Sequence, residues 1–438
     1  MWHYYFFLGI RNLRRNPLLT ALMVLTLAIG VAASISTLTI LHVMSGDPIP
    51  HKSDKLLVPV VDNFPLEGYV PGTFSEQDQL TYRDVANFLN SKQGVRRTGV
   101  YGIFLNVEPT RADLNVTPVA GLAVSSDYFA MFEVPIAQGR TWTEAEEKSA
   151  AKVLVLSAQQ SEKLYGKETA VGKRLRIDGN EYDVIGVMGA WNPVPRYTHL
   201  VTGSSEGFRG EDAVYMPFGT AIANQVSPNG KMWCSSMSGP GFQGILDSEC
   251  VWVQFWFEVN SASDRASVKD YLNNYLAEQK KLGRFPRPEP AQLFNVMEWM
   301  GYLHIVRDDS KLSAWLAFGF LLLCLVNTSG LLLAKFSSRS AEVGVRRALG
   351  ASRKEIFQQF LIETGVVGLA GGLIGLGLSF AGLWLIAQQS SEMAVLAKLD
   401  GTMLGVTFAL AVNTSILAGL LPTWRACQVT PAIQLKSQ

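Results

Sequence analysis

The sequence predicts a membrane protein with four transmembrane α-helices and a large α+β domain inserted between the first and the second. Its 438 residues are 48% hydrophobic, which exceeds what one soluble core normally requires. Four uncharged apolar runs also reach the roughly 18 to 25 residues that a helix needs to cross about 30 Å of hydrocarbon. These runs are Leu18 to Met44, Leu312 to Ala334, Gly365 to Gln388 and Met403 to Leu421.

The first run predicts an uncleaved anchor, although a cleaved signal peptide also begins with basic residues and an apolar stretch. Signal peptides carry an apolar region of only about 7 to 15 residues. The run from Leu18 to Met44 is longer, and no small-x-small cleavage pattern follows it. Before it, Trp2, Tyr5 and Phe6 share one helical face opposite the arginines, which is typical of a helix lying in the membrane interface.

The distribution of Lys and Arg predicts the orientation, because short cytoplasmic flanks collect these residues. The formal net charge is only +1, and the loop 389–402 offers only Lys398. Cations gather before the first run, between the second and third runs, and after the fourth run. They are Arg11, Arg14, Arg15, Lys335, Arg339, Arg346, Arg347, Arg353, Lys354, Arg425 and Lys436. We therefore expect both termini and the loop between the second and third spans in the cytoplasm.

This topology divides the chain into consecutive segments. They are an interfacial elbow helix (1–17), the first span (18–44), the outside α+β domain with its stalk (45–311), the second span (312–334), a cytoplasmic loop (335–363), the third span (364–388), a short outer loop (389–402), the fourth span (403–421) and a cytoplasmic tail (422–438).

The outside domain reads as mixed helices and strands with a poorly patterned middle. Periodicity and turn residues predict helices over 75–92, 158–165 and 264–282, and strands over 152–156, 174–177, 182–187 and 251–258. We expect the second and third of these strands to form a hairpin that turns at Asp178 and Gly179. Both faces of the last strand are aromatic or apolar, so we expect it to be covered on both sides. Residues 190 to 249 are rich in Gly, Ser, Pro and Asn, which favours long loops. After a Pro-rich break, the pattern of Val296, Met300 and Leu303 predicts a helical stalk that continues directly into the second span.

Two cysteines of the outside domain, Cys234 and Cys250, flank a loop rich in Gly and Ser. In an oxidising compartment we expect a disulfide between them, and the alternative is two independent buried thiols. The five histidines are scattered and no CxxC motif occurs. The sequence therefore predicts no metal site.

A hydrolase is one alternative, because Gly203 to Gly207 matches the G-x-S-x-G pattern around Ser205, with His199 nearby. That motif needs a strand before it and a helix directly after it, whereas Phe208 to Gly210 continue a loop. No HExxH motif and no phosphate-binding G-x-x-x-x-G-K-[ST] loop occurs. We expect no catalytic residue, no cofactor bound by this chain and no nucleic-acid partner, so that any ATP acts through a partner subunit.

The cytoplasmic loop predicts a rigid helix-turn-helix at the inner face of the membrane. A short helix carrying Glu342 and Arg346 stops at Gly350, a residue that readily adopts the left-handed conformation after helix ends. Ser352 and Glu355 have the spacing of a capping box that starts a second helix. The alternative is a charged loop that only sets the topology.

The loop sequence Glu342-Val-Gly-Val-Arg-Arg-Ala-Leu-Gly-Ala-Ser352 resembles the signature of MacB/FtsX-type ABC transporter permeases. Further segments resemble the elbow or the MacB-type periplasmic domain: 11–17, 124–129, 138–140, 164–166, 171–173 and 183–187. Residues 190 to 250 have no match in that pattern.

The resemblance implies a permease of the bacterial inner membrane with a periplasmic domain, working with a separate ABC ATPase subunit because no ATPase motif is fused. It implies that the ATPase-coupling residues are Glu342, Gly344, Arg346, Arg347, Gly350 and Ser352. It also implies a homo- or heterodimer of permeases, a periplasmic membrane-fusion adaptor as a candidate partner, and export or mechanotransmission. The alternative is a membrane-anchored sensor or scaffold whose outside domain regulates a cell-envelope partner.

In the third apolar run, Gly368, Gly372, Gly375 and Ser379 fall on one helical face. This small-xxx-small spacing predicts close helix packing. The spacing alone leaves open whether the neighbouring helix belongs to the same chain or to a second copy.

Overall fold

The computed structural model describes residues 16–72, 78–109, 115–200, 207–208, 210–389, 391–397 and 401–427. The chain divides into two compact units. One combines Met1–Met44 with Val306–Gln438, and the other is Ser45–Ile305. The expected elbow helix and the end of the expected tail lie outside the described residues.

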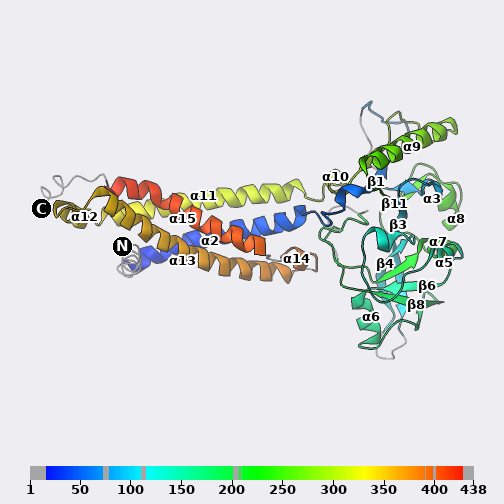
Figure 1. Cartoon of the computed structure of the whole chain (residues 1–438), viewed down its shortest axis with the longest axis horizontal. Helices are drawn as coiled ribbons and strands as arrows, with labels where there is room; N and C mark the ends of the chain where they lie inside the picture. Colours follow the sequence, from blue (N-terminus) through cyan, green and yellow to red (C-terminus); the bar gives the residue numbers. More distant parts are fainter. Residues whose placement is uncertain are drawn as a thin grey trace. The chain divides into compact units, whose positions relative to one another are not determined.

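The first unit is helical. Three of its helices, α2 (Pro17–Ser45), α11 (Asp308–Ser337) and α13 (Arg353–Ala387), are long and apolar enough to cross a membrane. A further helix, α15 (Gly401–Cys427), contains the fourth apolar run. The four lie side by side in Figure 1, and the short helices α12 (Ser340–Ala348) and α14 (Ser391–Leu396) connect them.

The second unit is a mixed α+β domain, as the sequence predicted, and its strands form one connected sheet. Its strands are β1 (Leu56–Val60), β2 (Leu80–Thr81), β3 (Arg96–Glu108), β4 (Thr117–Val124), β5 (Ile136–Gly139), β6 (Val153–Leu156), β7 (Arg174–Ile177), β8 (Asn180–Met188), β9 (Val214–Pro217), β10 (Trp233–Cys234), β11 (Cys250–Glu258) and β12 (Gln292–Phe294). The main path runs β12-β1-β11-β3-β4-β9-β6-β8-β5. The pairs β4–β9 and β6–β8 are parallel.

Short helices join and cover these strands (Figure 1). They are η1 (Ser53–Lys55), α3 (Tyr82–Asn90), α4 (Tyr128–Met131), α5 (Glu144–Lys148), α6 (Ala158–Tyr165), α7 (Phe218–Ala223), α8 (Gly241–Asp247), α9 (Ala262–Lys281) and α10 (Val296–Tyr302). The predicted hairpin turns at Asp178 and Gly179, with φ of 48° and 79°. The predicted helix over 158–165 matches α6, whereas the first predicted helix is shorter and begins at Tyr82.

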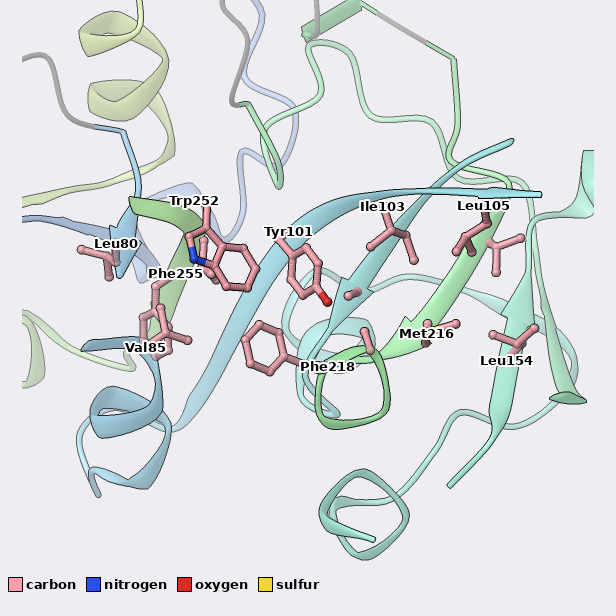
Figure 2. Packing of buried hydrophobic residues seen from close by; sticks show 14 of the residues in the cluster. Leu80, Val85, Tyr101, Ile103, Leu105, Leu154, Met216, Phe218, Trp252 and Phe255 are labelled. Carbon is pink, nitrogen blue, oxygen red and sulfur yellow. The ribbon is translucent and has the colours of Figure 1, made fainter. Parts of the chain in front are cut away.

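An aromatic cluster forms the centre of the domain core (Figure 2). Tyr101 of β3 lies between Trp252 of β11 and Phe218 of α7, with ring centroids 4.8 Å and 5.6 Å apart and edge-to-face geometry. Such pairs add about 0.5–1.5 kcal/mol beyond the burial of apolar area. All nine residues of β11 are buried, which confirms that this strand is covered on both faces.

The expectation of long loops over 190–249 was wrong in part. This stretch contains β9, α7, β10 and α8, and β9 pairs with β4 and β6 in the middle of the sheet. The four residues of β9 are all buried, so they show no alternation. A strand of this length between Gly-rich segments is too short for a periodicity test.

The expectation of a continuous stalk was also wrong. Helix α10 ends at Tyr302, His304 has a φ of 50°, and α11 begins only at Asp308. The helical spacing of Val296 and Met300 has another cause, because both are buried in the domain with Trp299. The chain therefore leaves the domain through a non-helical joint.

Candidate functional site

Helix α12 is held on one side by its neighbours. Val343 is 6% exposed and belongs to an apolar cluster with residues of α2, α11 and α13. The other buried members are Met23, Leu27, Leu332, Phe336, Ile356, Phe360 and Val367. The rings of Phe336 and Phe360 stack with centroids 4.3 Å apart. This cluster fixes α12 against three long helices at once.

Polar contacts add to this attachment. Arg346 pairs with Glu342 one turn earlier at 2.6 Å, and its other terminal nitrogen donates to Oε1 of Gln359 on α13 at 3.0 Å. The contact to Gln359 links α12 to the start of α13. Gly344 is half-buried in the middle of the helix.

The other side of α12 is open to solvent. Val345 is 55% exposed and Leu349, the residue that ends the helix, is 83% exposed. Val345 and Leu349 are four residues apart, so their side chains lie on the same face of the helix.

The turn after α12 has the predicted geometry. Gly350 has a φ of 103°, a conformation that glycine adopts without steric cost. Ser352 Oγ accepts a hydrogen bond from the Glu355 amide at 3.2 Å, and the Glu355 carboxylate accepts one from the Ser352 amide at 2.9 Å. This capping box begins α13. The structure thus brings Glu342, Gly344, Arg346, Arg347, Gly350 and Ser352 together on one helix and its turn.

A buried charge cluster lies beside α12 and was not predicted. Lys335, at the end of α11, and Glu363 of α13 have side chains that are 0% exposed, and Nζ lies 2.7 Å from Oε1. Arg339, at the start of α12, reaches the same carboxylate at 3.1 Å. In the sequence, Lys335 and Arg339 indicate only the topology. The one sequence signal for this cluster is Glu363, a glutamate at the edge of the third apolar run.

The small-residue face of α13 packs against α2 of the same chain. Gly368, Gly372, Gly375 and Ser379 are all buried. A Cβ added at Gly375 would lie 2.9 Å from the carbonyl oxygen of Ala28. Ser379 Oγ donates to the carbonyl oxygen of Gly375 at 2.9 Å, and it lies 3.5 Å from that of Ala32. The helix that packs against Gly375 and Ser379 is therefore α2 of the same chain.

In the outside domain, Cys234 and Cys250 are joined by a disulfide across the pair β10–β11. The strands meet with these two residues directly opposite, and Cys250 is fully buried. Ser205 of the G-x-S-x-G match falls outside the described residues. Within the described part of the chain, no group of three or more His, Cys, Asp or Glu side chains could hold a metal ion.

An N-terminal apolar helix, an inserted α+β domain and a helix-turn-helix between two further apolar helices define a polytopic membrane protein. The family model of the MacB-like periplasmic core domain matches residues 20–275, and that of the FtsX-like permease C-terminal matches residues 314–431. The chain belongs to the MacB/FtsX-like family of ABC transporter permeases. This confirms the resemblance seen in the cytoplasmic loop.

Named relatives are distant in sequence. The pyoverdine export ATP-binding/permease protein PvdT of Pseudomonas fluorescens is 26% identical over 85% of this chain and 50% of its own length. The macrolide export ATP-binding/permease protein MacB of Bdellovibrio bacteriovorus is 23% identical over 98% of this chain and 61% of its own length. The uncharacterized ABC transporter permease YknZ of Bacillus subtilis is 24% identical over 72% and 68%. The chain thus spans about half to two-thirds of the length of these relatives.

Two solved structures resemble part of the chain. The periplasmic region of MacB from Actinobacillus actinomycetemcomitans covers 57% of this chain and 92% of its own, with 13% identity and a TM-score of 0.35. The extracellular domain of YknZ covers 55% and 100%, with 15% identity and a TM-score of 0.35.

Proposed function

We propose that this chain is the permease subunit of an ABC transporter in which a separate ATPase subunit docks on α12 and its turn. One observation carries the proposal: α12 is fastened to α2, α11 and α13 by Val343, while Val345 and Leu349 stay exposed. A helix held in this way moves the long helices when a partner moves it. ATP hydrolysis in the partner would then drive the outside domain, for export or for mechanotransmission.

The proposal includes four spans in the bacterial inner membrane, with both termini in the cytoplasm. Helix α15 supports a fourth span, since its 27 residues include the uncharged run from Met403 to Leu421. In this proposal, residues 45–311 and 389–402 lie outside the membrane and residues 335–363 lie in the cytoplasm, as the distribution of cations predicts. A second permease, identical or different, and a periplasmic adaptor complete the proposed assembly.

Export is the direction of transport that we propose, because the names of two relatives contain the word. Those names concern pyoverdine and macrolides. For this chain we propose the direction of transport, export, and no substrate class.

Co-purification tests the ATPase partner. The tagged full chain is extracted in mild detergent from membranes of the bacterium that encodes it. We expect an ABC ATPase to co-purify and to hydrolyse ATP in a vanadate-sensitive reaction. Leu349→Asp places a charge at the exposed end of α12, and the double change Arg346→Glu with Arg347→Glu reverses its charge. Both variants should lose the ATPase.

Lys354→Glu is the matched control, because Lys354 is an exposed cation outside the proposed coupling set. It should retain the ATPase. If the wild-type chain brings down no ATPase, or if the α12 variants retain it fully, the sensor or scaffold alternative becomes the better description.

A further inference from the structure

The joint between α11 and α12 is bracketed by two cations that share one carboxylate. Lys335 lies in the last turn of α11, and Arg339 is the residue directly before α12. Ser338, between them, ends α11 and donates from its Oγ to the carbonyl oxygen of Lys335 at 2.8 Å. Both cations reach Glu363, which belongs to the neighbouring helix α13.

The cluster is enclosed by protein. The side chains of Lys335 and Glu363 are 0% exposed and that of Arg339 is 10% exposed. Arg339 Nη1 donates to both oxygens of Glu363, at 3.2 Å and 3.1 Å. Lys335 Nζ lies 2.7 Å from Oε1 but makes no hydrogen bond of good geometry within the described residues.

Stability alone does not account for this arrangement. Burying an ion pair costs desolvation energy that often cancels its Coulombic gain, and apolar replacements of the whole pair are often neutral or stabilising. The arrangement constrains the geometry of the joint, because both contacts persist only while the end of α11 and the start of α12 stay within reach of Glu363.

We propose that Glu363 is a positioning residue that fixes the angle between α11 and α12. Lys335 ties the end of α11 to α13, and Arg339 ties the start of α12 to the same point. A displacement of α12 then moves α11 and does not merely bend the chain at Ser338. Along the chain, α11 is connected to the outside domain. This inference rests on the proposed function, since it assumes that a partner moves α12.

Lys335, Arg339 and Glu363 are called the clamp below, and two variants test it. Arg339→Met removes the tie to α12 and leaves the contact between Lys335 and Glu363. The triple change Lys335→Met, Arg339→Met and Glu363→Gln removes the charges of all three side chains. If the triple variant does not fold, Arg339→Met alone decides the question. Arg339→Lys keeps the charge and should restore function, and Lys354→Met is the control for loss of an exposed cation.

Each protein is purified as the full chain with its co-purifying ATPase and placed in nanodiscs of bacterial phospholipid. Hydrogen–deuterium exchange is measured with and without ATP plus vanadate, over residues 340–348 and over residues 45–305. We expect wild type, Arg339→Lys and Lys354→Met to change in both regions. Arg339→Met and the triple variant should keep the ATPase, ATP hydrolysis and the change in 340–348, but lose the change in 45–305.

The outcomes separate the two proposals. A clamp variant that responds like wild type in both regions overturns the inference. So does a clamp variant that loses the ATPase, because the cluster would then act in docking. If wild type itself shows no ATPase or no response in 45–305, the proposed function fails and not only the clamp.

Discussion

Arg196 and Asp212 form a buried ion pair in the part of the outside domain that the sequence presented as loops. Their side chains are 5% and 0% exposed. Arg196 also donates to the carbonyl oxygen of Gly210 at 2.7 Å. Close by, the amide of Gln254 on β11 bonds both the N–H and the C=O of Leu200 at 3.1 Å. These side chains hold an irregular segment onto the sheet, where no strand pairing would.

Removal of one partner should therefore be costly. Asp212→Ala leaves the Arg196 guanidinium buried without its carboxylate, and we expect it to lower the free energy of unfolding by about 3–5 kcal/mol. Thermal unfolding of the detergent-solubilised full chain, followed by near-ultraviolet circular dichroism, measures the change. Glu144→Gln is the control, because Glu144 and its partner Lys148 are both 72% exposed, and it should have no measurable effect. Equal melting of the two variants would contradict the argument.

A second prediction concerns the pH dependence at α5. Hydrogen bonds from the Arg140 guanidinium and from the Thr143 amide lower the pKa of Glu146 from its ordinary value of 4.5 to about 2. A carboxyl group with a lowered pKa stabilises the fold fully above pH 4.5, and this contribution is lost as the pH falls towards 2.

Glu146→Gln should thus destabilise the protein by about 1 kcal/mol at pH 7, since the pair is partly exposed. The difference from wild type should shrink between pH 4.5 and pH 2. Melting curves of both proteins across that interval give the measurement. A difference that is independent of pH would show that the charge of Glu146 does not contribute.

At the scale of elements, the turn between α12 and α13 depends on one glycine. A Cβ at Gly350 would meet no atom within 4 Å, so the obstacle to substitution is its φ of 103° alone. Gly350→Ala should cost about 1–2 kcal/mol of backbone strain, and it should reorient α12. We expect less ATPase to co-purify, by roughly five- to thirtyfold if the strain appears fully in binding.

Gly365→Ala is the matched control for that experiment. Gly365 lies inside α13, and an added Cβ there also meets nothing within 4 Å. Because alanine is favoured over glycine within helices, this variant should be neutral or slightly more stable. Quantitative comparison of bound ATPase and of melting temperature separates the turn from a general effect of alanine. Identical behaviour of the two variants would exclude a special role for Gly350.

At the scale of the whole molecule, the proposed topology predicts which residues face which side of the membrane. Leu282, 73% exposed in the outside domain, and Lys354, exposed at the start of α13 and outside the proposed docking surface, are suitable positions for cysteine reporters. In a Cys427→Ser background, a membrane-impermeant maleimide should label Leu282→Cys in intact spheroplasts. It should label Lys354→Cys only after permeabilisation. Labelling of both in intact spheroplasts would contradict the orientation.

The local features of this chain were readable from its sequence. The apolar runs predicted the positions of α2, α11 and α13, and Ser352 with Glu355 predicted the start of α13. The turn at Asp178 and Gly179 predicted the hairpin of β7 and β8. Each of these features depends on residues that are close together in the chain. The length of an apolar run, a capping residue or the backbone conformation of a turn is enough to determine it.

Only the tertiary structure decided the features that depend on distant residues. The burial of β9 follows from β4 and β6 on either side of it, and the end of the stalk helix follows from packing of α10 in the domain. Lys335 and Arg339 are ordinary membrane-flanking cations until the fold places each of them within 3.1 Å of the Glu363 carboxylate. The sequence by itself determined the family, the long apolar helices and the α12 turn. It could not determine the clamp, because the energy of a buried charge depends on which groups the fold places around it.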